Sequence, residues 1–229
     1  MPCIYMYGQC SQIYGLTQRK FPMAHEYVQY GCGWCAPRTW LNFDASPTLR
    51  FERLPLIGAF YTRNAKRFPE NVQYGDITRG LPIPPDSCIG IYCAHVLEHL
   101  ARNELDAALR NTYSYLKVGG VFRFVLPDLE QLARNYLADA STEAADRFME
   151  ASCLGKKERP RGVRELAVAW LGNSAHLWMW DEKAMTEQLR KHGFVDIRRA
   201  AFGDAEDRKF DEVEVAERFN GCLAMQCRK

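Results

Sequence analysis

The alternation of short β-rich runs with segments of helical period is the feature that most constrains how this chain can fold. Seven runs are expected to be strands: residues 26–30, 40–43, 72–74, 88–93, 121–126, 195–200 and 222–227. Strands that alternate with helices along a chain are typical of a mostly parallel sheet with helices on both faces. The sequence therefore predicts a doubly wound (Rossmann-like) α/β fold, and 229 residues are enough for one such domain.

Two helices can be placed by their apolar period and their end signals. Residues 103–117 repeat apolar side chains on one face, and Gly119-Gly120 is expected to stop that helix. Residues 181–192 start with Asp181 as a cap and end before Gly193. Between these helices, residues 129–137 and 144–154 also have a helical pattern. We expect a helical lid at about 128–180, inserted between the fifth and sixth strands, over the sheet edge where such folds bind ligands.

Charge and hydropathy exclude several classes of partner. Thirty Lys and Arg stand against 28 Asp and Glu, so no overall field would attract nucleic acid. The longest apolar run, CIGIYCAHVL, is too short to form a transmembrane segment. Residues 1–22 lack the features of a secretory signal, so we expect a cytoplasmic protein with a loosely attached extension at 1–22 and one domain at 23–229. Nine irregularly spaced cysteines do not suggest disulfides, and the oligomeric state stays open.

The first motif with chemical content is a glycine turn followed by an acid. A β run enters Gly31-Cys32-Gly33, and a second β run ends in Asp44. Glycines let a backbone approach a ligand closely, and a carboxylate at the tip of the next strand can accept both hydroxyls of a ribose. Dinucleotides also need a helix after the glycines to hold the pyrophosphate, and there is no room for a full helix before the second strand. S-adenosylmethionine (SAM) has no phosphate, so the spacing favours SAM over NAD.

Two further segments agree with a nucleoside site in order and distance. Asp76 follows the third strand, where its carboxylate could accept from an adenine amino group, and Ile77 is available to pack on the ring. Ala94 and His95 lie at the carboxyl end of the fourth strand. In an open α/β sheet these strand ends meet at one edge.

Six ordered motifs resemble those of class I SAM-dependent methyltransferases, specifically the type 11 group, and are similar to predicted bacterial members with a shortened first helix. The motifs are GCG, NFDAS, GDITRGLPIP, CAHVLEHL, LKVGGVFRFVLPD and HLWMWDEKAMTEQLRKHGFVDIRRAAFGDA. The resemblance implies a seven-stranded sheet with its last strand antiparallel and SAM across the carboxyl ends of the first strands. It places cofactor contacts at ten positions: Tyr30, Gly31, Cys32, Gly33, Asp44, Ala45, Asp76, Ile77, Ala94 and His95.

One departure from the family pattern keeps alternatives open. Cys35 stands where the family has a third glycine, and the first helix is truncated. The main hypothesis is methyl transfer to an oxygen or nitrogen of a small molecule, lipid or sugar. A catalytically inactive SAM-fold binding or scaffold protein is the alternative, and a NAD-linked oxidoreductase is a third.

Three histidines are candidates for catalysis. A base is optional for methyl transfer, and His95, His99 and His176 are the residues that would remove a proton from a hydroxyl acceptor. Structural roles compete at each position, and Trp178 and Trp180 near His176 fit either an aromatic wall or the core. His95 and His99 have no adjoining ligand pair, so no metal site is expected.

The Cys32–Cys35 spacing formally matches a redox or zinc pair, but no second pair accompanies it. The run KKERPRGVR would attract an anionic substrate or serve as a solvated loop.

Overall fold

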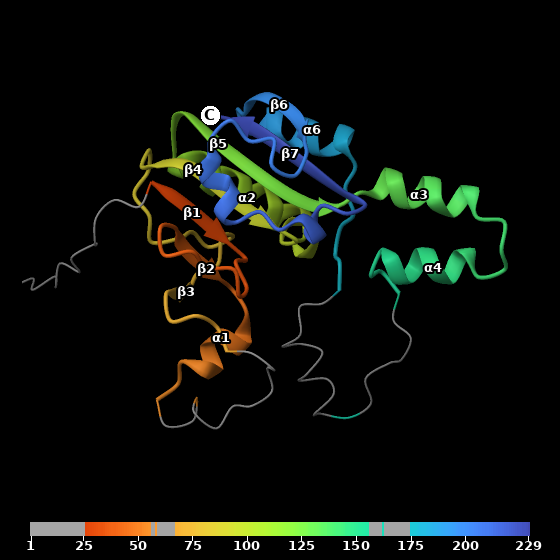
Figure 1. The fold of residues 1–229 in the computed structure, drawn as a ribbon, viewed down its shortest axis with the longest axis horizontal. Helices are drawn as coiled ribbons and strands as arrows, with labels where there is room; N and C mark the ends of the chain where they lie inside the picture. Colours follow the sequence, from red (N-terminus) through yellow and green to blue (C-terminus); the bar gives the residue numbers. More distant parts are fainter. Residues whose placement is uncertain (1–25, 56–57, 59–66, 156–161, 163–174) are drawn as a thin grey trace, which may run out of the picture.

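A seven-stranded sheet forms the centre of the computed structural model, which describes residues 26–55, 58, 67–155, 162 and 175–229 (Figure 1). Its strands are β1 (Tyr27–Tyr30), β2 (Leu41–Asp44), β3 (Val72–Tyr74), β4 (Cys88–Ala94), β5 (Leu116–Pro127), β6 (Val195–Ala200) and β7 (Cys222–Arg228). The strand order is β3-β2-β1-β4-β5-β7-β6. β7 pairs antiparallel with both β5 and β6, and the remaining neighbours pair parallel. The predicted fold class is confirmed.

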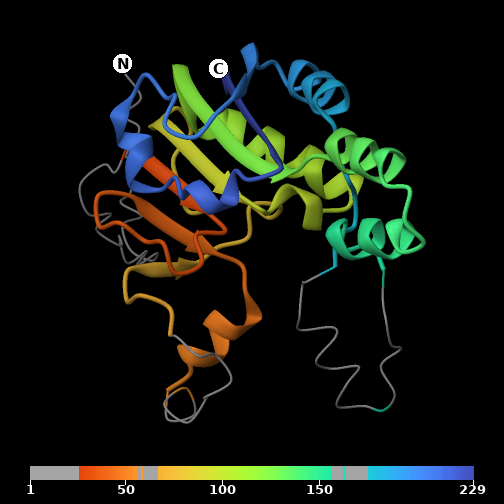
Figure 2. The same ribbon diagram turned by 45° about the vertical axis from the view of Figure 1, so that its right-hand side comes forward.

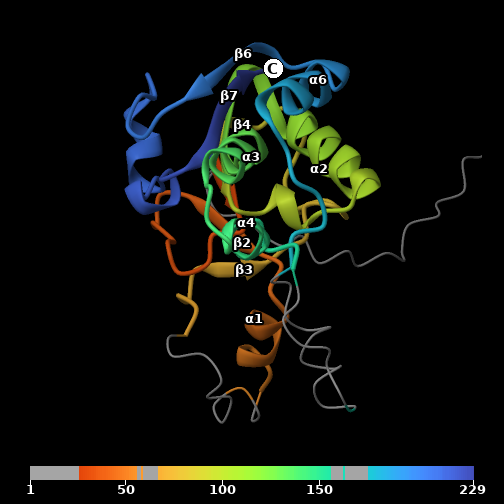
Figure 3. The same ribbon diagram turned by 90° about the vertical axis from the view of Figure 1, so that its right-hand side faces the viewer.

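Two amphipathic helices cover one face of this sheet. α2 (Arg102–Tyr115) buries Leu105 and Leu109, and α6 (Glu182–Lys191) buries Met185 and Leu189. These side chains share one core with the inward residues of β1, β4 and β5, and Figure 3 shows both helices on the same side of the sheet. Because each helix has a continuous apolar stripe, its burial follows from its period.

The expected end of α2 at Lys117, just before Gly119-Gly120, is two residues too late. The helix ends at Tyr115, and Leu116 already belongs to β5, where it pairs with Cys88 and is fully buried. Gly119 instead lies within β5 at φ +79°, and its N–H donates to the carbonyl of Lys229. Tertiary pairing with β4 thus ends the helix before the glycines are reached.

The opposite face is covered by irregular chain. All of residues 31–40 are described and contain no helix, which agrees with the truncation expected there. The segment 201–221, with the short 3₁₀ turns η3 (Arg208–Glu212) and η4 (Ala216–Arg218), lies over this face instead (Figure 3). Phe210 packs edge-on against Trp40 with ring centroids 5.6 Å apart. The segment therefore supplies the apolar cover that a helix between β1 and β2 would give.

A buried ion pair fastens the same segment to the centre of the sheet. Arg123 of β5 is 1% exposed and donates to Glu214 at 2.6 Å and to Asp204 at 2.9 Å. Glu214 also accepts the N–H of Gly203 at 2.9 Å. Because removal of one partner from such a buried pair leaves an uncompensated charge, the network fixes the position of 201–221 on β5.

Two helices follow β5 in the region expected to be a lid. α3 (Leu129–Ala138) and α4 (Ala144–Ala151) lie side by side (Figure 2), with the Tyr136 and Phe148 rings 5.7 Å apart. α4 ends three residues before the predicted boundary at 154.

Most of residues 156–174, including most of the basic run, lies outside the described residues, as does the extension at 1–22. α1 (Pro47–Glu52) and the 3₁₀ turn η2 (Leu97–His99) complete the structure. In the part of the chain that the structure describes, no helix is both long and apolar enough to cross a membrane.

Candidate functional site

The turn after β1 presents bare backbone at the carboxyl edge of the sheet. Gly31 and Gly33 have φ of +67° and +54°, a region that glycine enters without strain. A Cβ built on Gly31 would lie 2.1 Å from Cγ2 of Val96, so no larger residue fits there. A Cβ on Gly33 would meet only the Arg218 guanidinium, 4.0 Å away. The turn thus packs tightly on one side and leaves room beside Gly33.

Asp44 holds this turn from the end of β2. Its Oδ2 accepts the N–H of Gly33 at 2.9 Å, and its Oδ1 accepts the N–H of Ser46 at 2.8 Å. Each carboxylate oxygen keeps a further lone pair, because one oxygen can accept two hydrogen bonds. Asp44 is 8% exposed, so it can offer those lone pairs to a ligand only at the edge of the sheet.

The segment after β3 lies beside Asp44. The N–H of Gly75 donates to the Asp44 carbonyl at 3.1 Å, which joins the ends of β2 and β3. Asp76 closes a local turn, since its Oδ1 accepts the N–H of Thr78 at 2.9 Å and the Thr78 hydroxyl at 2.7 Å. Ile77 is 4% exposed and belongs to the core. The two predicted aspartates therefore meet at one edge, while Ile77 faces largely inward.

His95 follows Ala94, the last residue of β4, with a strained backbone at φ +56°. Its Nε2 lies 3.1 Å from the carbonyl oxygen of Arg218, and its Nδ1 lies 3.2 Å from Oε1 of Glu98 without hydrogen-bond alignment. The Cys222 side chain and then the Glu98 carboxylate raise the pKa of His95 to about 10. The Arg218 carbonyl on one side of the ring and the Glu98 carboxylate on the other both favour the protonated, positively charged form of His95.

Three other predicted cofactor contacts differ in how they are placed. Tyr30 is 2% exposed, with its hydroxyl oxygen 3.3 Å from Oγ1 of Thr112, so its side chain belongs to the core. Cys32 is also buried, and burial raises the pKa of its thiol, which disfavours a redox pair with Cys35. Ala45 is exposed at the end of β2. Tyr30 and Cys32 can therefore reach a cofactor only through their backbone.

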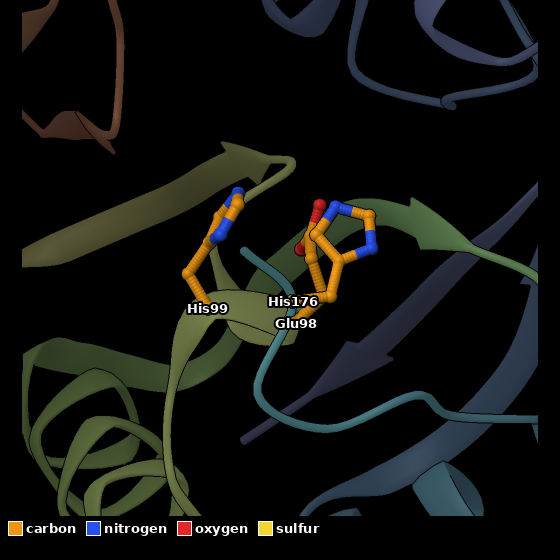
Figure 4. A group of neighbouring side chains, drawn as sticks. All are labelled: Glu98, His99 and His176. Carbon is orange, nitrogen blue, oxygen red and sulfur yellow. The ribbon is translucent and has the colours of Figure 1, made fainter. Parts of the chain in front are cut away.

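A second polar cluster lies directly after β4, and it joins residues far apart in the sequence. The carbonyl of Glu98 accepts the N–H groups of Leu177 at 2.8 Å and Trp178 at 3.2 Å, which holds the segment before α6 against η2. The His99 and His176 rings then meet edge to face with centroids 5.0 Å apart. Figure 4 shows the Glu98 carboxylate and both rings gathered at this junction.

The polar atoms of this cluster are largely unsatisfied. Glu98 is fully buried, and in the described chain neither of its carboxylate oxygens has a hydrogen-bond partner. The Nδ1 of His176 is also buried without a partner among the described residues, and burial lowers the pKa of this imidazole. The Nδ1 of His99 lies 3.1 Å from the carbonyl oxygen of Ala175. One potential ligand atom from each of the three side chains lies within 4.8 Å of the others.

The two tryptophans near His176 have separate environments. Trp180 is 1% exposed and packs in the core, whereas Trp178 is 40% exposed. The guanidinium of Arg102 lies 5.0 Å from the Trp178 ring centroid. The sequence left open whether these tryptophans form an aromatic wall or belong to the core. Trp180 belongs to the core, whereas the exposed Trp178 could form a wall beside the cluster.

The chain matches the family model described as a methyltransferase domain (Methyltransf_11) over residues 28–124. Those residues are a class I SAM-dependent methyltransferase domain. The match runs from β1 to β5 and includes the glycine turn, Asp44 and Asp76. SAM is the cofactor of this domain, and the bare backbone beside Gly33 fits a cofactor that needs no pyrophosphate anchor. No curated protein matches the sequence at a significant level.

Solved structures of SAM-dependent methyltransferases are similar to this methyltransferase domain at low identity. One from Archaeoglobus fulgidus shares 15% identity, covering 89% of this chain and 85% of that one, with a TM-score of 0.46. One from Mesorhizobium loti shares 20% identity over 89% and 90%, also with a TM-score of 0.46. One from Methanosarcina mazei shares 15% identity over 88% and 89%, with a TM-score of 0.45. Likeness at this level says nothing about the acceptor.

Two residues at this edge of the sheet were not predicted from the sequence as site residues. Arg218 approaches Gly33 from the β6–β7 connection, and no ion pair engages its guanidinium within the described residues. Glu98 has no predicted role in the motif CAHVLEHL, yet in the structure it clusters with His99 and His176, two of the predicted catalytic histidines. No local signal marks Arg218, because only the folded path of 201–221 brings it to the turn. For Glu98 the signal was present in HVLEH, but its partner His176 is supplied by a distant segment.

Proposed function

We propose that the methyltransferase domain moves the methyl group of SAM to an oxygen or nitrogen of a small molecule, lipid or sugar. The observation that carries this proposal is the meeting of two features at the carboxyl ends of β1, β2 and β4. One is the glycine turn with Asp44, and the other is the cluster of Glu98, His99 and His176. The first suits a nucleoside, and the second offers polar groups to an acceptor beside it.

In this proposal the cofactor contacts follow the strand ends. Gly31 and Gly33 would lie along the methionine part, Asp44 would accept from the ribose hydroxyls, and Asp76 would accept from the adenine amino group. Ala94 and His95 would face the sulfonium. The Arg218 guanidinium, beside the open space at Gly33, would pair with the methionine carboxylate.

The geometry of the turn supports SAM rather than a dinucleotide. A pyrophosphate is normally held by N–H groups at the start of a helix that follows the glycines. Residues 31–40 are fully described and contain no helix, so these donors are missing here. A ribose, an adenine and a zwitterionic tail need none of them.

Alignment is the main contribution that the chain can make to catalysis. Displacement at a sulfonium releases a neutral thioether, so the leaving group needs no acid. Fixing two reactants in line contributes up to ~7–11 kcal/mol in favourable cases. For a hydroxyl acceptor, a base would add a further ~10²–10⁴-fold, and His99 and His176 remain the candidates on this edge.

The test is calorimetry on the full chain with SAM, S-adenosylhomocysteine and NAD(H). We expect wild type to bind both SAM and S-adenosylhomocysteine and not NAD(H). Asp44→Ala should weaken SAM binding by ~10- to 150-fold, because hydrogen bonds to a charged group contribute ~1.5–3 kcal/mol. Glu187→Ala, which removes an exposed carboxylate of α6, is the matched control and should bind normally.

Turnover is tested with labelled SAM and fractions of a cell extract, separated into polar small molecules, lipids and saccharides. Labelled product with wild type that disappears with Asp44→Ala would support the proposal and name the acceptor class. NAD binding without SAM binding, or equal SAM affinity in wild type and Asp44→Ala, would refute it.

A further inference from the structure

Glu98 carries a buried carboxylate that the surrounding protein leaves unsatisfied. The residue is 0% exposed, and in the described chain neither oxygen accepts a hydrogen bond. The His95 ring approaches Oε1 at 3.2 Å without alignment, and Oε2 has no counterpart among the described residues. Buried carboxylates are normally paired with a cation or bound to a metal ion. The misaligned His95 ring approaches Oε1 alone, so Oε2 leaves room for a second positively charged partner.

Two imidazoles stand where they could share such a partner. The Nδ1 of His99 is engaged by the Ala175 carbonyl, which fixes the proton on Nδ1 and leaves a lone pair on Nε2. This backbone contact is the usual way in which a ligating histidine is oriented. His176 adds a second buried nitrogen without a partner in the described chain, its Nδ1. Together with the carboxylate, these groups form one cluster with ligand atoms within 4.8 Å.

We infer that Glu98, His99 and His176 form a binding site for a divalent first-row transition-metal ion such as zinc. One carboxylate and two imidazoles are a ligand set found in catalytic zinc sites, and that set leaves at least one position open. Around a tetrahedral zinc, ligand atoms at ~2.1 Å from the metal stand ~3.4 Å apart. The ligand atoms of the three side chains now lie within 4.8 Å of one another, and small side-chain rotations would bring them to that spacing.

The backbone already holds the two halves of the site together. The carbonyl of Glu98 binds the N–H groups of Leu177 and Trp178, so His176 cannot move far from η2. η2 in turn begins directly after β4, and Val96 between them contacts the glycine turn at Gly31. The site is therefore built on the rigid edge of the sheet.

The open position would accept an oxygen of the methyl acceptor, a step that rests on the proposed function. A metal-bound hydroxyl would lose its proton to water, because the cation stabilises the resulting oxyanion. His99 and His176 would then hold the metal ion and not serve as bases. The oxyanion lone pair would then form the bond to the methyl carbon while the carbon–sulfur bond breaks. That bond's electron pair stays on sulfur, S-adenosylhomocysteine leaves as a neutral thioether, and the metal keeps its oxidation state.

The experiment uses the full chain, stripped with a chelator and titrated with Co²⁺ as a visible probe and Zn²⁺ as its competitor. We expect one Co²⁺ per chain, displaced by Zn²⁺, with a spectrum free of thiolate charge-transfer absorption. Glu98→Gln and His99→Asn should each weaken binding by more than the ~10–100-fold that loss of an outer-shell partner costs. His192→Gln is the matched control, because this histidine bonds to Gln188 on α6, outside the cluster.

Four outcomes would overturn the inference: no Co²⁺ bound at millimolar concentration, thiolate bands in the spectrum, equal affinity in Glu98→Gln, or equal loss in His192→Gln. Thermal unfolding of each stripped variant separates loss of the site from loss of the fold. Catechol, a small diol, should shift the Co²⁺ spectrum, and no shift at saturation would exclude an open position. Because these readouts need no SAM, metal binding and the proposed methyl transfer can fail independently.

Discussion

The glycine turn and the Glu98 cluster lie at the same sheet edge but differ in how their polar groups are satisfied. Asp44 and Asp76 each accept hydrogen bonds from neighbouring backbone. The carboxylate oxygens of Glu98 and the Nδ1 of His176 have no hydrogen-bond partner within the described residues. The first region is shaped by the chain alone, so its shape precedes any ligand. The second leaves buried polar atoms of the described chain without hydrogen bonds, and the inferred metal ion would engage them.

The largest effect on stability is expected at Gly31, where the glycine turn packs most tightly. Gly31→Ala should lower the free energy of unfolding by roughly 2–5 kcal/mol, the sum of a left-handed backbone and overpacking against Val96. Gly33→Ala shares the positive φ but meets only open space near Arg218, so it should cost about 1–2 kcal/mol. Urea unfolding measures both.

A double variant separates the two causes. Gly31→Ala with Val96→Ala removes the contacting methyl groups, so it should recover the overpacking part and retain the backbone part. Equal stability of Gly31→Ala and Gly33→Ala would contradict the tight packing of the turn on Val96.

An intermediate effect on stability is expected when a metal ion binds the Glu98 cluster. If the Glu98 cluster binds zinc, then zinc at 100 times its Kd should raise the free energy of unfolding by about 2.7 kcal/mol, and a chelator should reverse the gain. Glu98→Gln should show no gain, whereas Glu187→Gln on α6 should behave as wild type. Thermal unfolding with and without zinc measures this, and a gain in Glu98→Gln equal to that of wild type would show that the ion binds elsewhere.

The smallest effect concerns Arg218, whose guanidinium approaches the glycine turn at Gly33. Arg218→Ala should weaken SAM binding by about 2- to 5-fold, since Arg218 is half-buried and a solvent-screened ion pair contributes only ~0.2–1 kcal/mol. The backbone carbonyl that meets His95 is retained in this variant. Calorimetry with Arg208→Ala, an exposed arginine of η3, is the control, and unchanged affinity in Arg218→Ala would remove this residue from the cofactor site.

Local signals explain which parts of the fold the sequence could predict. β6 has the expected bounds, 195–200, and α6 lies one residue inside its expected ends because Asp181 and Gly193 mark them. The end of α2 was misplaced because pairing of Leu116 with Cys88 overrides the glycine signal. The cover at 201–221 could not be foreseen, since it depends on long-range contacts of Arg123 and Phe210.

The contrast between local signals and long-range contacts also applies to the candidate site. The common position of Asp44 and Asp76 could be predicted because parallel strand ends converge at one edge, a rule that needs only the strand order. The association of Glu98 with His176 depends instead on a hydrogen bond from Leu177 to the Glu98 carbonyl, which no spacing rule encodes. The role of each site residue stays a prediction until the variants above are measured.

The placement of β7 between β5 and β6 has a consequence for synthesis on the ribosome. The strand that closes the sheet, and the Arg218 that approaches the glycine turn, both follow β6 in the chain and so emerge well after β1 to β5. A nascent chain that has completed β1 to β5 therefore already contains every glycine and aspartate of the proposed nucleoside site, yet lacks one wall of it. If Arg218 belongs to the cofactor site, firm cofactor binding should wait until β7 has paired with β5 and β6.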